Sequence, residues 1–233
     1  MGMQGLKGLF GGARRGPVVH SGRADPRSFA PRPRPPGRLS PEQALDWLKT
    51  GNAAFVASGA AIPPHERREI TELAKGQAPV AIVVGCSDSR VSPEIVFNCR
   101  LGDVFVVRVA GATVDPLALG SVEYAVQHLG CPLVVVLGHA GCGAVHAATQ
   151  AVTDNASFDG PLEEVVLPIL PSVLRAKAAG ANDLVNASVR EHVAKMARRL
   201  KTAASLADTL GQGRLKVAGG YYDMQSGKVE FIA

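Results

Sequence analysis

Three apolar, β-branched segments constrain the fold of this chain more than any other feature. They span residues 79–85, 103–111 and 132–140 and read PVAIVVG, DVFVVRVAG and PLVVVLGHA. Between the second and the third, residues 117–130 have their apolar side chains at helical spacing instead. Strands this apolar are buried on both faces, and helical connections join parallel strands. The sequence therefore predicts an α/β fold with a mainly parallel central β-sheet flanked by helices.

Further elements are predicted on either side of these strands. Ser40, Pro41 and Gln43 form a helix-capping pattern, so we expect an N-terminal helical arm to begin there and to break near Gly51. Apolar residues at helical spacing predict a helix over about residues 183–209. The closing LKVAGGYYD and KVEFI flank MQSG, which predicts a β-hairpin.

Residues 1–39 differ in composition from residues 40–233. They contain eight glycines and six prolines, so we predict a disordered tail followed by a single folded domain. The tail has eight basic side chains and one acidic side chain, for a net charge of +7, whereas the rest has 17 basic and 19 acidic, for −2. The basic charge thus belongs to the tail, and we expect no nucleic-acid binding by the domain.

The tail also carries a short apolar cluster beside basic residues, QGLKGLF at residues 4–10. Two hypotheses stay open: an unimportant terminus, or a peptide that docks on a protein partner or shell. No apolar run approaches the roughly 18 to 20 residues that a membrane span requires. Four dispersed cysteines do not suggest a disulfide framework. We therefore expect a cytoplasmic protein, recruited to a protein compartment if the tail docks there.

Reactive side chains follow the first and third predicted strands. Cys86, Asp88 and Arg90 follow the first, whereas His139 lies at the end of the third and Cys142 follows it. The carboxyl ends of parallel strands meet at one edge of a sheet, so both groups can converge there. Two thiolates and an imidazole suit zinc and leave a fourth position open. The alternative is a polar loop with a surface ion pair and a hydrogen-bonded core histidine.

Four segments carry a resemblance to a known family: in order, CSDSRVSPEIVF, LGDVFVVRVAG, GSVEYAVQHLG and VVVLGHAGCGAV. They resemble the successive motifs of the β-class carbonic anhydrases, and the resemblance extends from about Pro41 to the closing GGYYDMQSGKVEF. It implies a zinc lyase, a carbonic anhydrase that reversibly hydrates carbon dioxide to bicarbonate and a proton. In such enzymes zinc lowers the pKa of bound water from 15.7 to about 7.

The resemblance also implies individual roles. Cys86, His139 and Cys142 resemble the three constant zinc ligands of the family. Asp88 resembles the carboxylate that either occupies the fourth zinc position or releases it to water. Arg90 resembles the partner that holds this carboxylate off the metal, so Asp88 and Arg90 are the expected catalytic pair.

Roles in substrate binding carry over to four further positions. Phe105 and Tyr124 match an apolar wall that a neighbouring subunit partly supplies, with ordinary core packing as the alternative. Gly143 is assigned to the same pocket. Cys99 stands where the family often has a glutamine that binds substrate, and a thiol is a weaker donor. A shared wall implies a homodimer or a dimer of dimers, with the helical arm wrapping the second subunit.

Two other functions stay open. Ala112 and Ala140 also replace polar residues that are common in the family, and a less polar pocket would suit hydrolysis of carbon disulfide or carbonyl sulfide on the same fold. Alternatively, the chain is a recruited, zinc-stabilised subunit whose tail binds an assembly. His128 and His146 are either proton relays or surface residues of helices.

Overall fold

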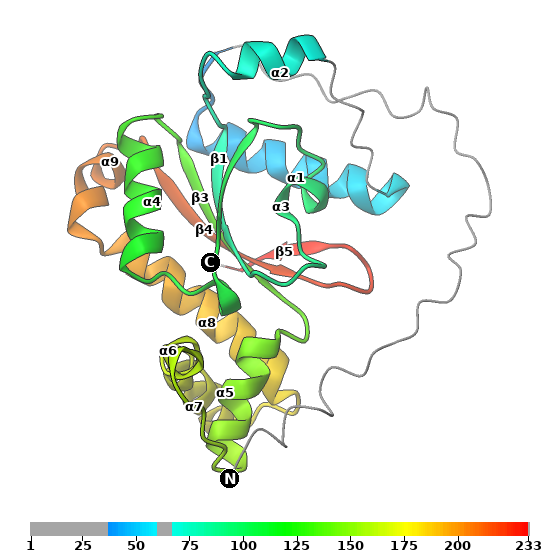
Figure 1. Ribbon diagram of the computed structural model, residues 1–233, viewed down its shortest axis with the longest axis vertical. Helices are drawn as coiled ribbons and strands as arrows, with labels where there is room; N and C mark the ends of the chain where they lie inside the picture. Colours follow the sequence, from blue (N-terminus) through cyan, green and yellow to red (C-terminus); the bar gives the residue numbers. More distant parts are fainter. Residues whose placement is uncertain (1–36, 60–66, 233) are drawn as a thin grey trace.

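A five-stranded sheet forms the centre of the computed structural model, which describes residues 37–59 and 67–232 (Figure 1). The strand order is β2-β1-β3-β4-β5; the first four strands are parallel and β5 is antiparallel to β4. The predicted mainly parallel sheet and the C-terminal hairpin are therefore confirmed. The strands are β1 (Ala81–Gly85), β2 (Val104–Arg108), β3 (Leu133–His139), β4 (Lys216–Tyr222) and β5 (Val229–Phe231).

Helices cover both faces of the sheet (Figure 1). One face packs against α1 (Pro41–Ser58) and α3 (Pro93–Val96). The other packs against α4 (Pro116–Gln127) and α8 (Leu184–Lys201), and α5 (Gly143–Thr153) and α7 (Leu170–Ala178) pack in turn on α8. The remaining elements are α2 (Arg67–Leu73), η2 (Ala110–Ala112), α6 (Pro161–Val166), η3 (Ala204–Leu206) and α9 (Ala207–Gly211).

The apolar strands supply two separate core clusters. In β1, Ile82 and Val84 belong to the cluster beneath α4 and α8, whereas Ala81 and Val83 belong to the cluster beneath α1. Every residue of β1 and of β3 is buried. This two-sided burial explains why these strands are continuously apolar rather than alternating.

The chain before the sheet forms one long helix. The predicted capping box is present: Gln43 donates its N–H to Ser40 Oγ (3.2 Å), and Ser40 donates its N–H to Gln43 Oε1 (2.8 Å). The expected break near Gly51 is wrong, because α1 continues without interruption to Ser58. The predicted tail and QGLKGLF lie outside the described residues, apart from positions 37–39.

Asn52 accounts for the continuity of α1. Its side chain is buried and donates to the carbonyls of Val96 (3.0 Å) and Gly227 (2.9 Å). It also accepts the N–H of Val229 at 2.8 Å. A helical glycine costs about 1 kcal/mol, whereas each net hydrogen bond contributes about 1 kcal/mol, so these three bonds outweigh the glycine beside them.

The helix predicted over 183–209 is wrong in its extent. It ends at Lys201, and η3 and α9 follow as short separate helices. The hydroxyl of Thr202 donates to the Arg198 carbonyl at 3.0 Å, which competes with the backbone bonds that would extend the helix. The turn that follows inserts Leu206, which is fully buried, into the core.

Gly138 lets α8 approach the sheet very closely. A Cβ atom at this position would lie 2.5 Å from Val193 Cγ2 and 2.8 Å from Val189 Cγ1. The contact occurs one residue before the end of β3, so α8 passes directly beneath that strand end. No helix of residues 37–59 and 67–232 has the length and apolar character that a membrane crossing requires.

The substitution Asn52→Ala tests the anchoring of α1. It leaves the three backbone partners of Asn52 without that side chain, so we expect the free energy of unfolding to fall by about 3 kcal/mol. Equilibrium urea denaturation measures the change. Asn182→Ala removes an exposed asparagine as the matched control and should change it by less than about 0.5 kcal/mol. Equal stability of the two variants would contradict the role of Asn52.

Candidate metal centre

Two neighbouring parallel strands deliver the predicted ligands to one edge of the sheet. β1 and β3 pair with Gly85 opposite Leu137. Cys86 therefore follows β1 immediately, while His139 ends β3 two residues beyond Leu137. A turn then leads to Cys142, the N-cap residue of α5. The expected convergence of the two cysteine-bearing segments is thus present.

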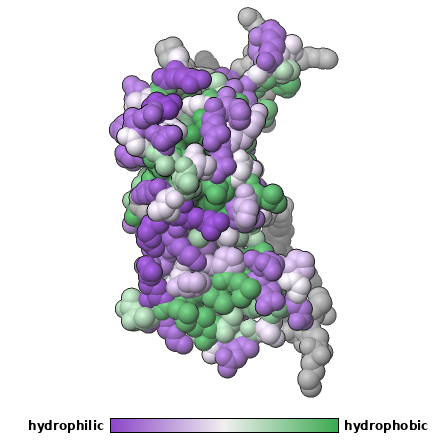
Figure 2. Space-filling model, turned by 90° about the vertical axis from the view of Figure 1, so that its left-hand side faces the viewer, coloured by the Kyte–Doolittle hydropathy of each residue, from purple (hydrophilic) through white to green (hydrophobic). Residues whose placement is uncertain are grey.

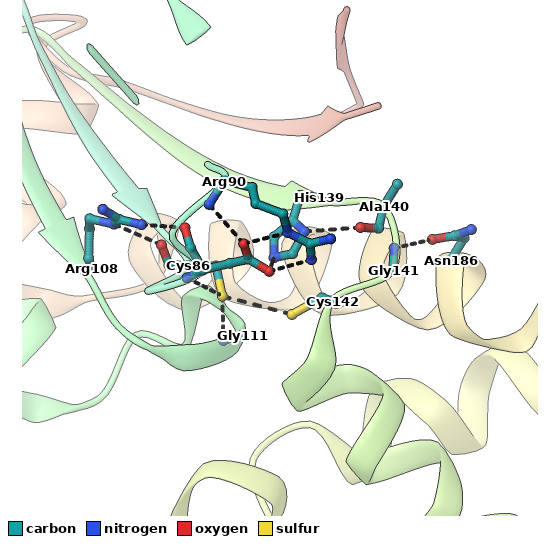
Figure 3. Close-up of polar contacts among 10 residues, drawn as sticks. Cys86, Arg90, Arg108, Gly111, His139, Ala140, Gly141, Cys142 and Asn186 are labelled. Atoms are coloured by element: carbon teal, nitrogen blue, oxygen red, sulfur yellow. Dashed lines mark hydrogen bonds and ion pairs between the residues drawn. The ribbon is translucent and has the colours of Figure 1, made fainter. Parts of the chain in front are cut away.

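The three side chains have the geometry of a metal site (Figure 3). One ligand atom from each of Cys86, His139 and Cys142 lies within 4.8 Å of the others, and the two sulfurs are 3.9 Å apart. His139 Nδ1 lies 3.0 Å from the Ala140 carbonyl, which can only accept, so Nδ1 carries the proton. The lone pair then belongs to Nε2, which is buried and has no hydrogen-bond partner among the described residues. A buried acceptor without a partner beside two sulfurs fits zinc.

The two thiols differ in their ionisation. Cys86 has its pKa lowered to about 4, chiefly because the Cys142 thiol donates to its sulfur. Backbone N–H groups of Asp88 and Gly111, each 3.4 Å from that sulfur, lower it further, whereas burial acts in the opposite direction. The pKa of Cys142 is raised by the hydrogen bond to Cys86 and by burial. Metal binding must therefore displace the Cys142 proton.

Asp88 and Arg90 form a two-pronged ion pair beside these ligands. Arg90 donates Nε to Asp88 Oδ1 (3.0 Å) and Nη2 to Oδ2 (2.7 Å). This hydrogen bonding is the main reason why the pKa of Asp88 is lowered to about 2. Asp88 Oδ2 is also 3.9 Å from His139 Nε2. The carboxylate is thus ionised, held by Arg90 and close to the candidate ligands.

Arg108, to which no sequence motif assigns a role, holds the backbone of this segment. It ends β2 opposite Gly85 and donates Nε to the Cys86 carbonyl (2.9 Å) and Nη2 to the Asp88 carbonyl (2.5 Å). The sequence feature that could have pointed to Arg108 is a positively charged residue at the end of the apolar strand DVFVVRV. Its carbonyl partners could not be identified without the strand register.

The predicted pocket residues are more dispersed. The rings of Phe105 and Tyr124 are 6.3 Å apart, and Tyr124 is half exposed and also lies 5.2 Å from His128. Gly143 begins α5, where an added Cβ atom would meet nothing within 4 Å. Cys99 lies in the core cluster beneath α1, whereas Cys86 and Cys142 lie in the other cluster. One chain therefore does not bring Cys99 to the candidate ligands.

Ala112 bears on the support of the metal centre rather than on the pocket. It is buried and has a φ of +56°, a left-handed conformation that costs an alanine roughly 1–2 kcal/mol. The preceding residue, Gly111, donates its N–H to the Cys86 sulfur. Ala112 thus places strain in the loop that supports Cys86.

Comparison with known proteins agrees with this geometry. The family model described as carbonic anhydrase matches residues 81–229. Carbonic anhydrase 2 of Mycobacterium tuberculosis is 39% identical over 81% of this chain and 91% of its own length. A carbonic anhydrase of Mycolicibacterium smegmatis is also 39% identical, over 82% of this chain and 93% of its own.

Comparison with solved structures indicates the same family. A tetrameric β-carbonic anhydrase of Sordaria macrospora has a TM-score of 0.66 and 26% identity, over 81% of this chain and 96% of that chain. Fold and site together define a class of α/β enzymes with a Cys-His-Cys group at the carboxyl edge of a parallel sheet. Within this class, the chain belongs to the β-carbonic anhydrase family, and the resemblance seen in its motifs is confirmed.

Cys142→Ser tests the ligand group. A serine hydroxyl stays protonated at neutral pH, so we expect zinc affinity to fall by more than about tenfold. Zinc retained after dialysis against a competing chelator, measured by atomic emission, gives the result. Cys131→Ala is the control: Cys131 is also buried, but its sulfur donates to the Pro79 carbonyl, before β1 begins. Equal zinc retention by both variants would contradict the assignment.

Proposed function

We propose that the chain catalyses the zinc-dependent, reversible hydration of carbon dioxide to bicarbonate and a proton. The observation that carries this proposal is the buried Nε2 of His139, which has no hydrogen-bond partner in the described part of the chain and is grouped with the sulfurs of Cys86 and Cys142. These three residues would hold the zinc ion, with a fourth position left open. Bound zinc supplies water whose pKa is lowered toward neutrality. Carbon dioxide hydration, the general reaction of the family, supports this choice.

Asp88 and Arg90 are proposed as the catalytic pair. An ionised carboxylate can only accept hydrogen bonds, so Asp88 would orient the attacking water. The two-pronged contact from Arg90 would set whether the carboxylate faces that water or the metal position. Arg108 would keep the Cys86–Asp88 backbone fixed while this happens.

A second copy of the chain is proposed to complete the substrate pocket. β2 is an edge strand, and nearby Tyr124 keeps half of its surface exposed. Figure 2 shows apolar side chains gathered on the side of the molecule that bears α4 and α6, where Leu117 and Leu162 are exposed. Such surface is typical of an interface. We infer a homodimer, or a dimer of dimers, with Phe105 and Tyr124 supplied across the interface and Gly143 supplied by the chain that holds the zinc ligands. Cys99 is buried in the core of its own chain, so it is not part of this shared wall.

The two alternatives make different predictions in the same preparation. A carbon disulfide or carbonyl sulfide hydrolase would release hydrogen sulfide and hydrate carbon dioxide poorly. A recruited subunit would lose its assembly but not its turnover when residues 1–39 are deleted, and unchanged assembly would exclude that hypothesis. The same deletion tests the proposed location. Loss of assembly would support recruitment of a cytoplasmic protein to a protein compartment through the tail.

Asp88→Ala tests the catalytic pair. The substitution removes the acceptor but none of the three ligands, so zinc should stay stoichiometric while kcat/KM falls by about a hundredfold or more. Stopped-flow hydration from about pH 6.5 to about pH 9 measures the rate; Asp88, with a pKa of about 2, stays ionised throughout. Asp154→Ala, at the exposed end of α5, should leave the rate unchanged. Wild-type protein with full zinc and no hydration would contradict the proposed function.

Mixed dimers test the shared pocket. One chain carries Asp88→Ala and the other Tyr124→Ala, and differently tagged chains are co-expressed and purified by both tags. If Tyr124 acts across the interface, each mixed dimer has one site with both residues intact, and hydration activity returns. If Tyr124 acts within its own chain, both sites stay defective and activity does not return. The two homodimeric variants are the controls.

A further inference from the structure

The turn between His139 and Cys142 depends on one peptide unit. The carbonyl of Ala140 accepts the Nδ1 proton of His139 at 3.0 Å. The N–H of Gly141, in the same peptide plane, donates to Asn186 Oδ1 at 2.9 Å (Figure 3). One peptide unit therefore connects a candidate ligand to a side chain of α8.

Asn186 is itself held in a single orientation. It lies in the first turn of α8, and its N–H donates to Oδ1 of the N-cap residue Asp183 at 3.0 Å. Its Nδ2 donates to Asp183 Oδ2 at 2.7 Å. Because a carboxylate only accepts, the amide nitrogen must face Asp183 and the amide oxygen must face Gly141.

The turn needs such a contact because Gly141 is conformationally permissive. Its φ is +60°, and glycine adopts positive and negative φ almost equally well. Rotation of the Ala140–Gly141 peptide by about 180° would interchange two turn types and remove the carbonyl from His139 Nδ1. The Ala140 N–H is fixed by the Tyr222 carbonyl at 2.9 Å, but it belongs to the preceding peptide unit. Asn186 therefore provides the bond that selects the observed orientation.

We propose that Asn186, oriented by Asp183, is a positioning residue for the metal ligand His139. By holding the Ala140–Gly141 peptide, it keeps the carbonyl on Nδ1, so Nε2 stays the free nitrogen directed at Cys86 and Cys142. The polarised peptide also strengthens its own carbonyl as an acceptor. This inference rests on the proposed function, since it requires that the site holds zinc.

Exchange of the two side chains provides a sharp test. Asn186→Asp keeps an acceptor for Gly141 but places two carboxylates face to face. Asp183→Asn keeps a side-chain oxygen that can cap the helix, but its amide NH₂ group then faces the amide NH₂ group of Asn186, and two donors cannot form a hydrogen bond. The double exchange, Asp183→Asn with Asn186→Asp, restores all three hydrogen bonds: only the bond between the two side chains reverses its direction, and the two backbone N–H groups donate as before. Asn182→Asp is the control for added charge on an exposed neighbour.

Zinc release from the full-length holoprotein to a chromogenic chelator is the first measurement. We expect each single variant to release zinc about tenfold faster than the wild type, the lower end of the range for groups that support a ligand. The double exchange and Asn182→Asp should stay within about twofold of the wild type. The second measurement is the visible spectrum of the Co²⁺-substituted protein, which should change in the single variants and return in the double exchange.

The outcomes separate this inference from the proposed function. A wild type that holds no zinc would refute the zinc site itself. A wild type that holds zinc, with single variants equal to it in release rate and cobalt spectrum, would overturn the role of Asn186 alone. A double exchange that releases zinc as fast as Asn186→Asp would also overturn it, because a hydrogen-bonded acceptor for the Gly141 N–H would then not be enough to hold the ligand in place. Thermal unfolding of each variant shows that it is folded before release is compared.

Discussion

Parallel pairing of β1 with β3 is the constraint on which the candidate site depends. Because the two strands run in the same direction, their carboxyl ends reach one edge together and place Cys86 beside His139. Antiparallel pairing would send these residues to opposite edges. Both strands are buried on both faces, so neither can shift its register without exposing apolar residues or disrupting the two core clusters. The ligand geometry is thus specified by packing throughout the core.

Each negatively charged group at the site has its own hydrogen-bond donors. The thiolate of Cys86 accepts backbone N–H groups, and the carboxylate of Asp88 accepts a guanidinium, so each anion has its own donors. Arg108 bonds to backbone carbonyls instead and adds positive charge without competing for Asp88. These donors are needed because the Cys86 thiolate and the Asp88 carboxylate are both negative and only two residues apart.

Much of this arrangement follows from the sequence, for identifiable reasons. Strand composition predicted the sheet, and reactive residues at strand ends predicted Cys86, His139 and Cys142, because both patterns are local. The continuity of α1 through Gly51 could not be predicted, since the partners of Asn52 lie on distant segments. Arg108 and Asn186 were missed for the same reason: Arg108 bonds to the backbone carbonyls of Cys86 and Asp88, and Asn186 bonds to the backbone N–H of Gly141, all on distant segments. The position of Cys99 relative to a second subunit is likewise not encoded in any local pattern.

One consequence follows from the spacing of the ligands along the chain. Cys86 and Cys142 are 56 residues apart, and they belong to different strand-to-helix connections. Only the folded chain assembles the group, so an ion that binds there binds the native state and not the unfolded one. By thermodynamic linkage, its binding free energy adds to the stability of the whole domain. The metal would then act as a reversible crosslink, and the concentration of free ion would set how strongly the folded domain is favoured over the unfolded chain.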